Sequence, residues 1–147
     1  MRDAFGGIVN LSMIVVFLVL VCGYLAFNVN YTKAFRVKNY VITSLEQYEG
    51  NCGNSSECST KINNYIRQIG YNAPNLDLTD EGYTCVKGYC YKEFEATSTS
   101  EGVSESNKKV YYKVVTQISI DIPIINNIMG LSIFQVSGDT KLITPFK

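Results

Sequence analysis

The chain begins with one long apolar segment, and its charged residues come almost entirely after it. Residues 4–32 include no charged side chain, and residues 8–29 are almost continuously apolar. As an α-helix, residues 8–29 would extend about 33 Å, slightly more than the roughly 30 Å hydrocarbon core of a bilayer. This apolar run is longer than that of a cleaved signal peptide, and Asn28-Val29-Asn30 is not a small-residue cleavage site. The pattern predicts an uncleaved signal anchor, with residues 1–30 forming a short tail and a single transmembrane helix.

The same helix is predicted to continue beyond the membrane as an amphipathic helix. Residues 31–48 contain neither Pro nor Gly. Apolar residues recur there in steps of three and four, which places them on one helical stripe: Ala34, Val37, Val41, Leu45 and Tyr48. Gly50 is suited to the left-handed position that follows a helix. We therefore expect helix 31–49 to be continuous with the membrane helix and to need a folded domain against its apolar stripe.

A polar loop, a short helix and a β-hairpin are predicted next. Residues 51–58 are polar, and Ser59 is a candidate N-cap for a helix over residues 60–69. Residues 83–91 have the pattern of a hairpin with Lys87-Gly88 at its turn.

Two longer strands are predicted in the last third of the chain. Residues 110–122 alternate between apolar and polar side chains, as in a half-buried strand. The side chains predicted to share its buried face are Tyr112, Val114, Thr116, Ile118, Ile120 and Ile122. A final strand is expected over residues 132–143, with Phe134, Val136 and Leu142 facing inward and Gly138 as a bulge. The predicted fold class is α+β: a long transmembrane-to-amphipathic helix packed on a small antiparallel sheet, with residues 31–147 forming the folded domain.

Four of the five cysteines form two close pairs in the sequence, Cys52/Cys58 and Cys85/Cys90. In the predicted hairpin, Cys85 and Cys90 would be a non-hydrogen-bonded pair with Cα atoms about 4.5 Å apart, within the range that a disulfide needs. Four cysteines allow three pairings, of which we favour 52–58 together with 85–90. A zinc site made of all four is the alternative, although their spacing is looser than that of the usual zinc knuckles.

The orientation in the membrane is indicated by two conflicting signals. Lys33, Arg36 and Lys38 follow the apolar segment, whereas only Arg2 precedes it, and this asymmetry favours a cytoplasmic domain. Long domains, however, cross the membrane largely regardless of charge, and paired cysteines indicate an oxidising compartment. We predict a single-pass protein of the cell membrane with a cytoplasmic N-terminus and an extracytoplasmic domain.

Composition excludes several function classes. Lys plus Arg and Asp plus Glu are both 13, so the chain lacks the basic excess typical of nucleic-acid binders. Histidine is absent, which removes Ser-His and Cys-His nucleophile pairs and every zinc site that contains His. We found no catalytic or cofactor-binding motif, and we predict a protein that is not an enzyme and has no cofactor.

The order of these features resembles type IV pilins and pseudopilins, most of all the TadE-like minor pseudopilins of tight-adherence pili. In the TadE-like proteins a strand ends at an apolar turn that contains Pro, and a final strand follows. Here the corresponding segments are Val114 to Ile124, which includes Pro123, and Gly130 to Gly138. Gly6-Gly7 precedes the apolar segment, as in prepilins, but Asn10, Leu11 and Ser12 occupy the positions where prepilins have a Glu. We therefore assign no processing site, and the sequence leaves open whether the N-terminus is processed.

The resemblance implies a structural subunit of a secretion or adhesion filament. Its partners would be the lipid bilayer and then other pilin-like subunits or assembly proteins, with residues 8–29 forming the assembly surface. The alternative is a single-pass envelope protein whose outer domain binds a ligand or a protein partner.

Overall fold

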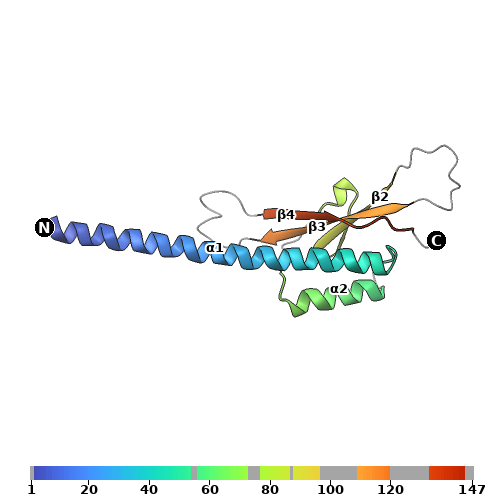
Figure 1. Cartoon of the computed structure of the whole chain (residues 1–147), viewed down its shortest axis with the longest axis horizontal. Helices are drawn as coiled ribbons and strands as arrows, with labels where there is room; N and C mark the ends of the chain where they lie inside the picture. The colour runs from blue at the N-terminus through green and yellow to red at the C-terminus, as the bar shows by residue number, and fades with distance from the viewer. Residues whose placement is uncertain are drawn as a thin grey trace.

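The computed structural model describes residues 2–53, 56–72, 77–86, 88–96, 109–119 and 133–144. Its elements are α1 (Arg2–Gln47), α2 (Glu57–Gln68), the 3₁₀ turn η1 (Thr79–Glu81), β1 (Thr84–Val86), β2 (Tyr89–Glu95), β3 (Val110–Ser119) and β4 (Ile133–Asp139). The strands form one antiparallel sheet in the order β1-β2-β3-β4. In Figure 1, α1 runs along the sheet and far beyond it, and α2 lies along the other side of α1. The fold is α+β, as the sequence predicted.

Helix α1 joins the apolar segment to the domain without interruption, which confirms the predicted continuity. It begins at Arg2 rather than near Ile8, and it ends at Gln47 in a turn over residues 48–50. Gly50 has φ +82°, and its N–H donates to the carbonyl of Leu45 at 2.9 Å. This glycine therefore takes the left-handed position that the sequence assigned to it.

The amphipathic part of α1 forms one side of the hydrophobic core. Its stripe of Ala34, Val37, Val41 and Leu45 is fully buried, and Tyr48 is half-buried. Across from it lie side chains from one face of β3, also buried: Tyr112, Val114, Thr116 and Ile118. Each fully buried aliphatic side chain stabilises the fold by about 1.5–3 kcal/mol relative to its exposed state. The predicted apolar faces of the helix and of the strand are confirmed where the structure describes them, and residues 120–122 lie outside the described ranges. The strand is not half-buried throughout, however, because Val115 and Gln117 on its other face are buried as well.

Gly138 is not the bulge that the sequence suggested. It pairs with Val114 in a regular antiparallel register. A Cβ added at this position would lie only 3.1 Å from both Ile42 Cδ1 and Lys38 Cδ of α1. The glycine therefore allows the helix to approach β4 closely, a role that depends on tertiary packing.

The prediction for the end of β4 was wrong in two respects. The strand stops at Asp139 rather than at Ile143, and Leu142 is exposed. Ile143 is the buried residue, and it makes an isolated bridge to Val110. Once the ladder ends, the two-residue alternation no longer determines which side chains face inward. Val136 packs against the core as predicted, whereas Phe134 stays about two-fifths exposed.

Helix α2 also begins earlier than predicted. Its N-cap is Ser56, whose side chain accepts a hydrogen bond from the N–H of Ser59 at 3.1 Å. Ser59, the predicted cap, is instead a buried residue of the first turn. Both serines are good capping residues, and Glu57 between them stabilises the earlier start because an acidic side chain is favoured in the first helical turn.

The hydroxyl of Tyr71 completes the sheet where β2 begins. Tyr89 pairs with Thr116, so no residue of β2 faces Gln117. The Tyr71 hydroxyl donates to the carbonyl of Gln117 at 2.5 Å and accepts from its N–H at 3.1 Å. Burial raises the pKa of Tyr71 to about 12, although its bond to the Gln117 backbone opposes the shift, so the hydroxyl keeps its proton at neutral pH.

Substitution Tyr71→Phe tests this contact. It leaves the N–H and the carbonyl of Gln117 without their partner, and we expect the free energy of unfolding to fall by about 1–3 kcal/mol. Urea unfolding in mild detergent, followed by near-ultraviolet circular dichroism, measures the change. Tyr111→Phe is the matched control, because no hydrogen bond of that hydroxyl is found in the described part of the chain, and it should change stability by less than about 0.5 kcal/mol. Equal losses in the two variants would contradict the role of Tyr71.

Candidate functional site

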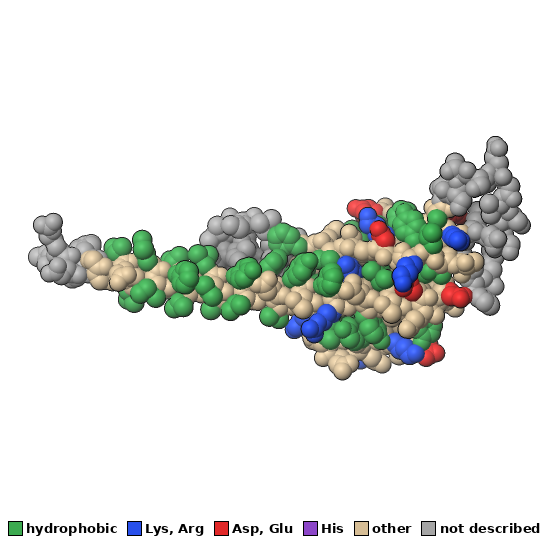
Figure 2. All heavy atoms as spheres, in the orientation of Figure 1, with side chains coloured by type: hydrophobic (Ala, Val, Ile, Leu, Met, Phe, Trp, Pro, Cys, Tyr) green, Lys and Arg blue, Asp and Glu red, His purple; other side chains and the backbone are tan. Residues whose placement is uncertain are grey.

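The most unusual surface of the protein is the N-terminal part of α1, residues 6–26, which we call the free half. Figure 1 shows it extending away from the sheet and α2. Its large hydrophobic side chains are exposed, from Ile8 at 66% to Leu25 at 58%. On the face shown in Figure 2, hydrophobic side chains line this part of the helix and the charged ones lie over the domain. Among the described residues, α1 is the one helix long and apolar enough to cross a membrane.

Such a surface requires a cover. A helix that is apolar on all sides occurs inside a membrane or inside a bundle of other helices. Monomeric soluble proteins rarely expose apolar patches larger than a few hundred Å². The described part of the chain buries none of the most apolar part of α1, and lipid or other proteins can provide the cover that such a surface needs.

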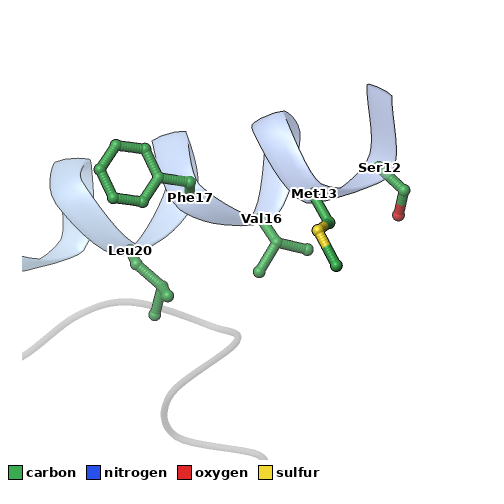
Figure 3. A pocket seen from close by; sticks show the side chains of 5 residues that line it. All are labelled: Ser12, Met13, Val16, Phe17 and Leu20. Carbon is green, nitrogen blue, oxygen red and sulfur yellow. The ribbon is translucent and has the colours of Figure 1, made fainter. Parts of the chain in front are cut away.

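The hollows on the free half fit hydrocarbon rather than a polar substrate. Figure 3 shows one of them, which is lined by the hydrophobic side chains of Met13, Val16, Phe17 and Leu20. Ser12 completes its lining. A second hollow is lined by Leu18, Val19, Cys22, Gly23 and Ala26. Each lies between neighbouring turns of one helix and is open to the outside, so it offers a groove for an acyl chain or for a side chain of another helix.

The free half ends where Phe27 meets the sheet. The ring of Phe27 packs edge-on against Phe134 of β4, with the ring centroids 6.0 Å apart. It also packs against the small cluster formed by Ala34 and Ile118. The folded domain therefore begins immediately beside the end of the apolar segment, with no linker between them.

The four predicted disulfide cysteines form two separate bridges in the favoured pairing. Cys52–Cys58 has a Cα–Cα distance of 5.1 Å and links the turn after α1 to the first turn of α2. Cys85–Cys90 has a Cα–Cα distance of 4.1 Å and crosses the β1–β2 pair in the predicted register. Lys87, at the predicted turn, lies outside the described residues. Sulfur atoms paired in this way provide no thiolate for zinc, and Cys22 is the remaining free cysteine, exposed on the free half.

Three tyrosines of the core have raised pKa values, and in each case the main cause is burial. Burial raises the pKa of Tyr89 to about 12, and it also raises the pKa of Tyr91. The pKa of Tyr112 is raised by burial and then by its hydrogen bond to Glu93, at 2.8 Å. These rings belong to the core beneath α1 and α2. They are therefore neutral packing residues at physiological pH.

The charged residues with shifted pKa values on α2 lie at its surface. The hydrogen bonds that Lys61 donates to Tyr48 and Glu57 raise the pKa of Lys61, and the same lysine lowers the pKa of Glu57. Lys61 and Glu57 form an exposed ion pair of 3.0 Å, a type of contact that contributes little to stability. Within the described ranges, no group of three or more acidic or cysteine side chains is arranged to hold a metal ion.

Sequence reasoning did not identify the aromatic contacts at the end of the free half. Phe27, Tyr31 and Phe35 are four residues apart and stack in sequence along α1. Their spacing was a visible signal, since residues four apart are neighbours on a helix. The contribution of Phe134 could not be predicted, because it depends on where β4 crosses α1.

Comparison with models of known protein families, with curated protein sequences and with solved structures finds no match to this chain. The resemblance to pilin-like proteins therefore remains one of pattern. The chemistry of the exposed helix, together with the disulfide-bonded domain, is the basis for the proposal below.

Two lysines in the free half test whether lipid covers it. In Val16→Lys/Leu20→Lys, each lysine near the centre of a spanning helix costs about 2.5–3.5 kcal/mol, so the fraction of the chain that resists carbonate extraction from membranes should fall sharply. Thr43→Lys/Gln47→Lys is the matched control, because it introduces two lysines at the same spacing on exposed positions of the docked part of α1. It should behave like the unchanged protein. Full membrane integration of the first variant would show that the free half does not cross the bilayer.

Proposed function

We propose that this chain is a membrane-anchored structural subunit that resembles a minor pilin or pseudopilin of a tight-adherence or type IV-like filament system. The observation that supports the proposal is the free half of α1, which is uncharged, exposed on all sides and continuous with a helix that docks onto a small sheet. Before assembly, the bilayer covers the free half. In a filament, the free halves of neighbouring subunits cover one another.

The exchange between these two covers is energetically balanced. Lipid tails are as apolar as leucine side chains, so helices in a membrane associate through close packing rather than through the hydrophobic effect. Small residues favour close packing because they let two backbones approach. The free half has a region of small side chains next to Val19, formed by Cys22, Gly23 and Ala26. The subunit can therefore be stored in the membrane and transferred into a bundle of helices without exposing its apolar surface to water.

An extracytoplasmic position of the domain agrees with its disulfides and with the roles of its basic residues. Disulfides persist in oxidising compartments. Lys33 donates to the carbonyl of Gly70 at 3.2 Å, where it ties α1 to the end of α2. Lys38 is 9% exposed, and its amine lies 4.3 Å from the centroid of the Phe35 ring. These two lysines have roles in the folded domain, which accounts for their presence without a cytoplasmic location.

Shearing of intact cells tests assembly into filaments. We expect part of the chain to appear in the sheared surface fraction together with other filament proteins. In that fraction a short bismaleimide cross-linker should join neighbouring chains through Cys22, the one cysteine outside the disulfides. Cys22→Ser is the control and should give no cross-linked dimer.

Retention of the whole population in the membrane, with no filament protein co-purifying, would contradict the filament proposal. It would favour the alternative of a single-pass envelope protein whose outer domain binds a ligand or partner. Membrane anchoring itself would be unaffected by this outcome.

Counting accessible thiols tests the orientation. Protein taken from its native envelope and denatured without reductant should react with maleimide at one cysteine, and after reduction at all 5. Mass spectrometry measures the number of labels, with alkylation during cell lysis to prevent later oxidation. Labelling of all 5 cysteines before reduction would place the domain in a reducing compartment and reverse the proposed orientation.

A further inference from the structure

An exposed aromatic surface lies where the free half of α1 meets the sheet. We call it the aromatic stripe, and it consists of Phe27, Tyr31 and Phe35 on α1 with Phe134 on β4. The ring centroids are 6.2 Å apart for Phe27 and Tyr31 and 6.3 Å apart for Tyr31 and Phe35. Three of the four are substantially exposed: Tyr31 at 43%, Phe35 at 40% and Phe134 at 39%. The stripe therefore presents aromatic surface outward from two different elements.

The position of the stripe along α1 places it at the level of lipid headgroups. If residues 8–29 fill the hydrocarbon core, Tyr31 lies about 3 Å and Phe35 about 9 Å beyond its boundary. The headgroup layer on each side of a bilayer is roughly 5–8 Å thick, so the backbone of Tyr31 lies within it and that of Phe35 lies just past its outer edge. Aromatic side chains on a helix point back toward its N-terminus, which brings the Phe35 ring closer to the layer. Phe27 lies within the apolar segment, and Phe134 touches Phe27. The beginning of β4 must therefore reach the membrane surface together with the helix.

The charges near the stripe fit phosphate groups. Between Asp3 and Glu46 the chain has no acidic residue. Arg36 is exposed beside Phe35, whereas Lys38 is buried with its amine over the Phe35 ring, so Arg36 is the basic side chain that is open to phosphate groups here. Tyrosine with its amphipathic ring is enriched at membrane interfaces, and basic side chains there are attracted to anionic lipids.

We propose that the aromatic stripe is a membrane-interface surface that seats the α1–β4 side of the domain in the phospholipid headgroup layer. This inference deepens the proposed function and rests on its membrane-anchored stage. Lipid is favoured as the occupant because the stripe is continuous with the apolar surface of the free half, and because its depth and the exposed Arg36 beside it both match the interface. The domain then stands at a fixed height on the membrane, since no flexible linker separates it from the anchor.

The absence of tryptophan makes a direct test possible. Phe134→Trp places a single fluorophore on the stripe of the full-length chain, which is reconstituted in vesicles of phosphatidylcholine and phosphatidylglycerol. We expect blue-shifted emission and a roughly two-fold loss of intensity with lipids labelled by nitroxide near the headgroup, as for an aromatic ring at the interface. Phe35→Trp, on α1, should give the same result and provides a second reporter.

Phe94→Trp is the matched control. Phe94 is also an aromatic residue of the sheet and half-buried, but it stacks on Tyr111 near the end of β2 farthest from the stripe. The emission of this variant should be insensitive to the labelled lipids. A disulfide-intact mass and an unchanged far-ultraviolet circular dichroism spectrum confirm that each variant is folded.

Phe17→Trp, in the free half, separates the two proposals. Quenching of the fluorophore at position 17 by lipids brominated deep in the acyl chain, with position 134 behaving like position 94, would overturn the interface surface while membrane anchoring stands. Absence of quenching at both position 17 and position 134 would overturn both. Blue-shifted emission from position 134 that appears only at a high protein-to-lipid ratio would show that a second copy of the chain, rather than lipid, covers the stripe. This result would also contradict the proposal.

Discussion

The structure depends on the burial of one aliphatic stripe of α1 against the sheet. Ala34, Val37, Val41 and Leu45 have no exposed surface, and the sheet has no other long helix to pack against in the described part of the chain. Because α1 is a single unbroken helix, this packing also fixes the direction of the free half. The domain cannot fold back over the free half without separating its own core. The exposure of the apolar segment is thus a consequence of how the domain folds.

The two disulfides stabilise the positions of the short elements of the domain, α2 and β1. Each closes a short loop, with sequence separations of 6 and 5, so the entropic stabilisation of each is at the modest end of the typical 2–4 kcal/mol. Their positions matter more than their loop lengths. Cys52–Cys58 holds α2 at the end of α1, and Cys85–Cys90 holds the three-residue strand β1 against β2 at the sheet edge. Short elements of this kind are marginal without such links.

The sequence predicted the features that depend on local periodicity. The helical stripe of α1, the buried face of β3 and the register of the Cys85–Cys90 hairpin follow from repeats of three to four or of two residues. The predictions that were wrong concern residues whose positions are determined by tertiary contacts. Gly138 is small because α1 approaches it, and Leu142 is exposed because the ladder has already ended. The N-cap of α2 is Ser56 rather than Ser59. Local preference alone does not distinguish these two serines, because they are chemically equivalent.

The proposed exchange of lipid for neighbouring helices places the specificity of assembly outside the free half. With no charged side chain between residues 4 and 32, two free halves can recognise each other only by the shapes of their side chains and by a few polar groups such as Asn10 and Ser12. Packing of this kind is strong but weakly selective, because one apolar helix resembles another in hydrocarbon. The surfaces that can distinguish the correct neighbour are those of the domain, which has both charge and fixed geometry. The rigid junction at Phe27 then becomes important, since it transmits the orientation chosen by the domain to the helix inside the bundle.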